Sequence, residues 1–214
     1  MLEIKIAPSI LSADFAHLLD DVLAVEKAGA DILHIDVMDG HFVKNITMGP
    51  LVVKALKGKT KLLLDTHLMI SDPDYYAPIF AEAGADMIGI QVESFSDLSA
   101  IIQKIKVLNV KPYLVLNPDT PLNVIEPVLG QLDMVLLMAV FPGFAGQKFI
   151  ADVVPKIRQL RSMAPDIDIM VDGGINPQTS KIAREAGANI LVAGSAIFGA
   201  EDYTGIIQEL RGSC

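Results

Sequence analysis

The sequence predicts an α/β fold: a single-domain (β/α)₈ TIM barrel of the phosphate-binding type that spans residues 1–214. Three related segments indicate this fold, KAGADILHIDV (27–37), EAGADMIGIQV (82–92) and EAGANILVAGS (185–195). Each joins a helix end to a glycine that suits a left-handed cap (Gly29, Gly84 and Gly187). An apolar run follows, as expected for a parallel strand buried on both faces. A helix, a glycine and a strand in repeated order are typical of βα units.

Eight strands are expected, at about residues 4–10, 32–38, 62–69, 87–93, 111–116, 134–140, 168–173 and 190–195. Between them, apolar residues at helical spacing predict helices, for example over 15–28 and 151–163. The helix predicted over 71–83 has an aspartate cap and a proline in its first turn. No linker divides the chain. A doubly wound open sheet is the alternative, but SILSADF, not G-x-G-x-x-G, follows the first strand.

Composition limits the classes of function. The longest apolar run, MVLLMAVF (134–141), is shorter than the ~20 residues of a membrane span, and the N-terminus does not resemble a signal peptide. The net charge of −9 argues against a broad nucleic-acid surface. The single cysteine, Cys214, allows no internal disulfide and fits a reducing compartment. We expect a cytoplasmic protein without nucleic-acid or membrane partners, and a homo-oligomer whose size the sequence leaves open.

Polar residues interrupt three of the predicted strands. Because side chains alternate along a strand, each set below shares one face. The sets are His34, Asp36 and Met38 in the second strand, Asp65, His67 and Met69 in the third, and Met170 and Asp172 in the seventh. If these faces point inward, the polar groups meet at the C-terminal mouth of the barrel, where such barrels carry out their chemistry.

Two imidazoles and two carboxylates at one mouth suit a divalent metal ion. The candidate ligands are His34, Asp36, His67 and Asp172. We expect zinc first, with iron(II), manganese or cobalt as alternatives. The alternative is that each is a hydrogen-bonded core residue, but burying each unpaired would cost several kcal/mol. Met38, Met69 and Met138 end strands on the same side; methionine is usually an adaptable core residue, and here it could also form a dry lining.

Glycine-rich loops follow the last three strands, at 141–149, 172–180 and 193–199. Barrels often bind phosphate with the loops after strands seven and eight and a short helix N-terminus. Gly173, Gly174, Gly194 and Ser195 occupy these positions. The alternative is that the glycines only shape turns. Because backbone amides need no lysine, a small phosphorylated substrate is compatible with the net charge of −9.

Several motifs together resemble the ribulose-phosphate 3-epimerase family nearly from end to end: IAPSILSADF (6–15), HIDVMDGHFV (34–43), HLMI (67–70), LNPDTPL (116–122), PGFAGQKFI (142–150), VDGGIN (171–176) and VAGSAIFG (192–199). The resemblance implies a metal-dependent isomerase of the pentose phosphate pathway that interconverts D-ribulose 5-phosphate and D-xylulose 5-phosphate through an enediolate. It implies that Asp36 and Asp172 are the acid/base pair and, with His34 and His67, the metal ligands. It also implies that Ser9 and His67 contact substrate, and that Gly143, Phe144, Ala145 and Gly146 join the glycines above around the phosphate.

Four positions depart from the family pattern: Lys44, Gln91, Phe141 and Ala145. We expect them to influence substrate length and affinity, and none to touch the metal or acid/base set. Ala145 also resembles allulose-6-phosphate 3-epimerases, so a hexulose 6-phosphate (allulose or fructose 6-phosphate) is the alternative substrate. A lyase or decarboxylase on a related barrel is a rival interpretation. Such enzymes carry a D-x-K-x-x-D motif on the third strand, and His67 stands here in place of its lysine, which favours a metal ion over an ammonium group. A non-catalytic sugar-phosphate sensor is a second rival interpretation. Asp36 and Asp172 argue against it, because binding alone does not need a carboxyl group on each face of the sugar.

Overall fold

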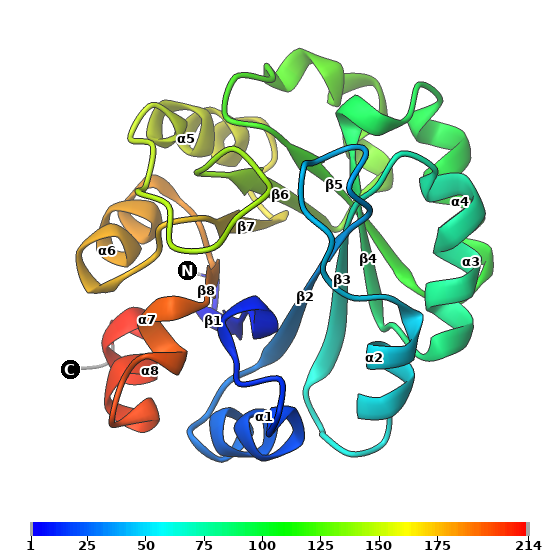
Figure 1. Cartoon of the computed structure of the whole chain (residues 1–214). Helices are drawn as coiled ribbons and strands as arrows, with labels where there is room; N and C mark the ends of the chain where they lie inside the picture. The colour runs from blue at the N-terminus through cyan, green and yellow to red at the C-terminus, as the bar shows by residue number, and fades with distance from the viewer. Residues whose placement is uncertain (1, 213–214) are drawn as a thin grey trace.

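Eight parallel strands form a barrel with the helices outside it (Figure 1), as the sequence predicts. The computed structural model describes residues 2–212, so Cys214 lies outside the described residues. The strands are β1 (Lys5–Pro8), β2 (Ile32–Met38), β3 (Leu63–Met69), β4 (Met87–Gln91), β5 (Lys111–Leu116), β6 (Met134–Met138), β7 (Asp168–Asp172) and β8 (Ile190–Ala193). Their order around the sheet is β1-β8-β7-β6-β5-β4-β3-β2. The assignment of all of residues 1–214 to one domain stays a prediction.

The barrel closes where β1 meets β2. These two strands share one isolated parallel bridge, between Ser9 and His34, in place of the paired register seen at the other strand junctions. Below it, the Asp31 backbone N–H donates to the Ile6 carbonyl at 3.0 Å. The Asp31 carboxylate in turn accepts from the Ile6 N–H at 2.7 Å. The junction between β1 and β2 therefore includes one bridge between two site residues, Ser9 and His34.

The helices are α1 (Leu18–Lys27), α2 (Pro50–Leu56), α3 (Pro73–Ala83), α4 (Leu98–Val107), α5 (Val153–Met163), α6 (Pro177–Ala186), α7 (Ser195–Phe198) and α8 (Tyr203–Arg211). Short 3₁₀ turns are η1 (Ile10–Ser12), η2 (Val92–Ser94), η3 (Leu122–Val124) and η4 (Glu126–Gln131). Between β5 and β6, in the described chain, the two 3₁₀ turns η3 and η4 stand where an α-helix is expected. Pro121 and Pro127 flank and interrupt this stretch, and proline in a helix interior removes a backbone donor.

The predicted helix boundaries are largely confirmed. Asp72 caps α3 by accepting from the Tyr75 N–H at 3.1 Å, and Pro73 is in the first turn. Gly84 and Gly187 end α3 and α6 with φ of 110° and 114°, in the left-handed region that favours glycine. The first strand ends earlier than the predicted residue 10, because Ser9 caps η1 and accepts from the Leu11 N–H.

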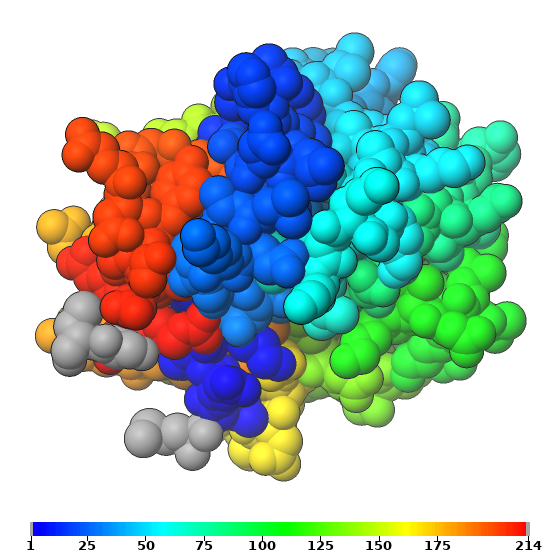
Figure 2. All heavy atoms as spheres, turned by 90° about the horizontal axis from the view of Figure 1, so that it is seen from below, coloured from blue at the N-terminus to red at the C-terminus, as the bar shows by residue number. Residues whose placement is uncertain are grey.

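The strands have an apolar layer on each face, one under the helices and one inside the barrel. The outward faces, for example Leu33, Ile35 and Val37 of β2, pack under the helices. The inward faces supply a second cluster that fills the barrel, including Tyr113 and Met170. His34 and Asp36 therefore face inward, as predicted, above an apolar floor. In the space-filling view, α8 in red lies beside the blue N-terminal segment (Figure 2), where β8 meets β1. Among residues 2–212, no helix has the length and apolar character to cross a bilayer.

Candidate active site

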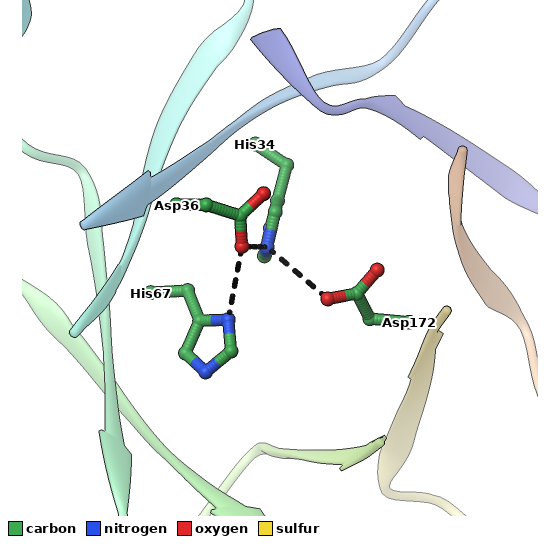
Figure 3. A group of neighbouring side chains, drawn as sticks. All are labelled: His34, Asp36, His67 and Asp172. Carbon is green, nitrogen blue, oxygen red and sulfur yellow. Dashed lines mark hydrogen bonds and ion pairs between the residues drawn. The ribbon is translucent and has the colours of Figure 1, made fainter. Parts of the chain in front are cut away.

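Four side chains from three strands converge at the C-terminal mouth (Figure 3): His34 and Asp36 from β2, His67 from β3 and Asp172 from β7. One donor atom of each lies within 4.8 Å of the donor atoms of the others. The strand register explains the meeting, because Asp36 pairs with His67 across β2 and β3. Asp172 reaches in from β7, which β1 and β8 separate from β2. The structure thus brings together the four residues that the sequence selects as candidate ligands.

Asp36 lies at the centre of this group. Its Oδ1 is 3.3 Å from His34 Nε2 and 3.3 Å from His67 Nδ1. Asp172 Oδ2 lies 3.9 Å from His34 Nε2, on the far side of that nitrogen (Figure 3). Both imidazoles are fully buried, whereas both carboxylates line the pocket above them. The carboxylates therefore face the space that a substrate would enter.

Two further side chains hold the group in place. The Ser9 hydroxyl donates to Asp36 Oδ2 at 2.6 Å. Asp65 Oδ2 is 2.7 Å from His34 Nδ1, so the His34 ring can donate from Nδ1 and direct Nε2 at the site. Sequence reasoning placed Asp65 on the inward face but gave it no role. The signal was present, because Asp65 alternates with His67 along β3.

Gln91 requires a correction. The expectation that none of the four departures touches the metal or acid/base set is wrong, because the Gln91 amide nitrogen is 2.9 Å from His67 Nε2. Gln91 is fully buried at the end of β4, on the strand next to β3. Its inward direction follows from the alternation of Gly89 and Gln91 along that strand, so strand periodicity was the signal that could have found it.

The two carboxyl groups have different acidities. Burial, strengthened by the nearby charge of Asp36, raises the pKa of Asp172 to about 6. Burial would also raise the pKa of Asp36, but His34 and then His67 outweigh it and hold that pKa far below its usual range. Burial alone would lower the pKa of His34, yet Asp36 and Asp65 raise it well above the ordinary value. Without a metal ion, a proton near neutral pH is thus held by Asp172 more readily than by Asp36.

The donor set fits a divalent metal ion. In the described part of the chain, His34 Nε2 is buried and has no hydrogen-bond partner, although it points at two carboxylates. An imidazole nitrogen left in this way is a ligand geometry that a cation would satisfy. Two nitrogens and two carboxylate oxygens within 4.8 Å of one another match the number that zinc binds. A metal could therefore bind here, and the identity of the metal stays a prediction.

A pocket opens above the carboxylates and joins them to the glycine-rich loops. The candidate substrate and lining residues that border it are Ser9, Met38, Met69, Met138, Gly143, Phe144, Ala145, Gly146, Gly173, Gly174, Gly194 and Ser195. His67, the remaining candidate substrate contact, does not border the pocket, because its side chain is fully buried below Asp36. The structure thus gathers the residues predicted from three loops around one opening; their individual roles stay predictions.

The loops around the pocket are shaped by close approaches. A Cβ on Gly174, whose φ is +64°, would lie 2.3 Å from the Phe149 backbone nitrogen. The turn-shaping role of this glycine therefore holds alongside its position on the pocket wall. Two residues that sequence reasoning did not select brace the loop after β6. Asn45 donates to the Gly143 carbonyl at 2.8 Å, and Gln147 donates to the carbonyls of Phe141 and Phe144.

Fold and site together define a phosphate-binding type of (β/α)₈ barrel enzyme with a paired-carboxylate centre. A model of the ribulose-phosphate 3 epimerase family matches residues 5–198, and the chain belongs to this family. It is therefore an isomerase. It is 56% identical to a ribulose-phosphate 3-epimerase of Bacillus subtilis, over 98% of this chain and 99% of that protein. It is 50% identical to a ribulose-phosphate 3-epimerase of Synechocystis sp., over 98% of this chain and 94% of that protein.

Solved structures confirm the fold. A structure of KGPDC from Streptococcus mutans has a TM-score of 0.73, covers 99% of this chain and 97% of that chain, and is 14% identical. A structure of 3-hexulose-6-phosphate synthase has a TM-score of 0.70, covers 99% of both chains and is 20% identical. At this identity the likeness concerns the barrel alone. The hexulose-phosphate alternative gains nothing from it, whereas curated relatives at 44–56% identity are named for ribulose phosphate.

Proposed function

We propose that this chain interconverts D-ribulose 5-phosphate and D-xylulose 5-phosphate by moving a proton at C3. The observation that carries the proposal is the pair Asp36 and Asp172, which line one pocket with pKa values shifted in opposite directions. Inverting C3 of a 2-ketose requires one group to remove a proton and another to return one to the opposite face. Asp36, with the lowered pKa, stays ionised, and Asp172, with a pKa of about 6, takes up a proton more readily; this difference suits a base and an acid that act together.

In one direction, Asp36 is the base and Asp172 the acid, and the roles reverse in the other direction. Asp36 is held as a carboxylate by the imidazoles below it and is oriented by the Ser9 hydroxyl at 2.6 Å. Within residues 2–212 no hydroxyl donates to the Asp172 carboxyl group, and burial favours its protonated form. Because the two groups come from β2 and β7, a planar intermediate between them can be protonated from either face.

His34, Asp36, His67 and Asp172 would hold the divalent ion. When bound, the ion supplies positive charge that stabilises the oxyanion formed as C3 loses its proton. Met38, Met69 and Met138 border the same pocket and keep water from the reacting carbon. The glycines after β7 and β8, with Ser195 at the start of α7, would receive the phosphate group through backbone N–H groups.

Three finer assignments belong to the same proposal. Zinc is our first choice of metal, because two imidazoles and two carboxylates form a common zinc donor set. A cytoplasmic location is the second assignment, because a single cysteine allows no internal disulfide and fits a reducing compartment. A homo-oligomer is the third assignment, and its size is left open. Metal analysis of the purified protein and light scattering after size exclusion test the first and the last.

The decisive variant is Asp172→Asn. Asparagine keeps the shape but neither donates nor accepts the reacting proton, so we expect a folded protein whose turnover of ribulose 5-phosphate falls at least about 10³-fold. A coupled assay for xylulose 5-phosphate measures turnover, and circular dichroism confirms the fold. The exposed Asp166→Asn is the matched control and should keep wild-type activity. Near-normal turnover by Asp172→Asn would refute the assignment.

A further inference from the structure

The His67 ring lies between two polar partners. Its Nδ1 is 3.3 Å from Asp36 Oδ1, and its Nε2 is 2.9 Å from the amide nitrogen of Gln91. All three side chains are buried, His67 and Gln91 completely. In Figure 3 the Nδ1 edge of the ring faces Asp36, and Nε2 points away from the other site residues. His67 could therefore offer only Nδ1 to an ion at the site, and Gln91 is the partner of the other nitrogen.

A neutral imidazole carries one ring proton, so the two partners cannot be chosen independently. With the proton on Nδ1, His67 donates to Asp36, and Nε2 accepts from the Gln91 amide N–H. The Gln91 amide nitrogen faces Nε2, which matches this arrangement, and among residues 2–212 Gln91 Oε1 is then buried without a partner. With the proton on Nε2, the Nδ1 lone pair becomes free for a cation, and Nε2–H needs an acceptor. A half-turn of the Gln91 carboxamide supplies Oε1 as that acceptor.

We infer that Gln91 is a positioning residue that supports both tautomers of His67: one that donates to Asp36 and one that presents Nδ1 to a divalent metal ion. The inference rests on the proposed function, because it concerns metal binding at that site. A carboxamide is suited to this role because one side of it donates and the other accepts, in nearly the same shape. Glutamate would serve only the tautomer protonated at Nε2, and methionine would serve neither.

The test uses the full-length protein, its Gln91→Glu and Gln91→Met variants, and Gln208→Met as a control on the exposed face of α8. Nitrogen-15 NMR of the imidazoles reads the His67 tautomer, and competition with a chromophoric chelator gives the zinc dissociation constant. In the wild type we expect the proton on Nδ1 without metal and on Nε2 with zinc. Gln91→Glu should carry the proton on Nε2 in both states.

Zinc affinity should fall about 10- to 100-fold in Gln91→Met, as found when a partner of a metal-bound histidine is removed. It should stay within about threefold of wild type in Gln91→Glu and in Gln208→Met. A merely structural role for Gln91 would lower stability in Gln91→Met without changing the tautomer in Gln91→Glu. Unfolding curves for each variant separate these cases.

Two results would overturn the inference: one and the same His67 tautomer with and without zinc, or wild-type zinc affinity in Gln91→Met. The proposed function is tested separately by the epimerase assay on the wild type. A wild type that changes tautomer on binding zinc but does not epimerise ribulose 5-phosphate would overturn the function and keep the inference.

Discussion

Asp172 is a pocket-lining carboxyl group whose pKa is raised by burial. Its folded-state pKa of about 6 lies above its ordinary value of 3.8. Between these values the folded protein holds a proton that the unfolded chain releases. The stability that this proton contributes is therefore complete below about pH 4 and is lost as pH rises through about 6.

This linkage predicts that Asp172→Asn stabilises the metal-free protein above pH 6, because asparagine does not ionise. We expect a gain of about 1–3 kcal/mol in the free energy of unfolding at pH 7.5, which shrinks toward zero near pH 4. Urea unfolding of chelator-treated protein between pH 4 and 7.5 measures it, with Asp166→Asn as the control. Parallel pH profiles for wild type and Asp172→Asn would contradict the prediction.

At the same scale, strand alternation located His34, Asp36, His67 and Asp172, because a period of two fixes the face of each side chain. Strand alternation alone does not predict which side chains of neighbouring strands contact each other. The bonds from Asp65 to His34 and from Gln91 to His67 depend on register, which needs the folded sheet. Residues that orient other residues are thus harder to select than those that face the pocket.

Adjacent strands β4 and β5 show how one element makes room for another. Gly89 pairs with Tyr113 in the ladder, and a Cβ on Gly89 would lie 2.2 Å from Tyr113 Cζ. The Tyr113 ring is fully buried in the barrel interior, so it cannot move toward solvent. A glycine in the middle of this strand is therefore required by a close approach of the neighbouring aromatic ring.

We predict that Gly89→Ala lowers the free energy of unfolding by about 1–3 kcal/mol or more, because it overpacks the interior. Adding Tyr113→Leu should recover part of the loss, which would reveal coupling between the two positions. Gly130→Ala is the control, since a Cβ there meets nothing within 4 Å. Denaturant unfolding gives the free energy of unfolding of the wild type, the two single variants, the double variant and the control. Additive effects of Gly89→Ala and Tyr113→Leu would contradict the prediction.

Element types followed well from local pattern, and their ends less well. An aspartate and a glycine marked the two ends of α3, and a glycine marked the end of α6, because cap chemistry is local. After β5 the expected helix position is taken by 3₁₀ turns, because Pro127 interrupts the run. Strand ends depend on where neighbouring strands stop pairing, so β1 (Lys5–Pro8) is shorter than the predicted strand over 4–10.

For the whole molecule, metal removal separates activity from folding. Two apolar layers and the Ser9–Asp36 and His34–Asp65 bonds hold the barrel without an ion. We predict that a chelator abolishes most activity while circular dichroism at 25 °C stays unchanged. The midpoint of unfolding should fall modestly, since a ligand at 100 times its Kd contributes about 2.7 kcal/mol. Unfolding on chelation would instead assign the metal a structural role.

Barrel closure has a consequence for folding. The joint between the first and second strands contains Ser9 and His34, and Ser9 also anchors Asp36. A chain in which this joint has not yet formed cannot align these groups, however complete the other seven junctions are. During refolding, enzyme activity should therefore appear when the first and second strands join. The rate at which turnover recovers would measure the rate of that step.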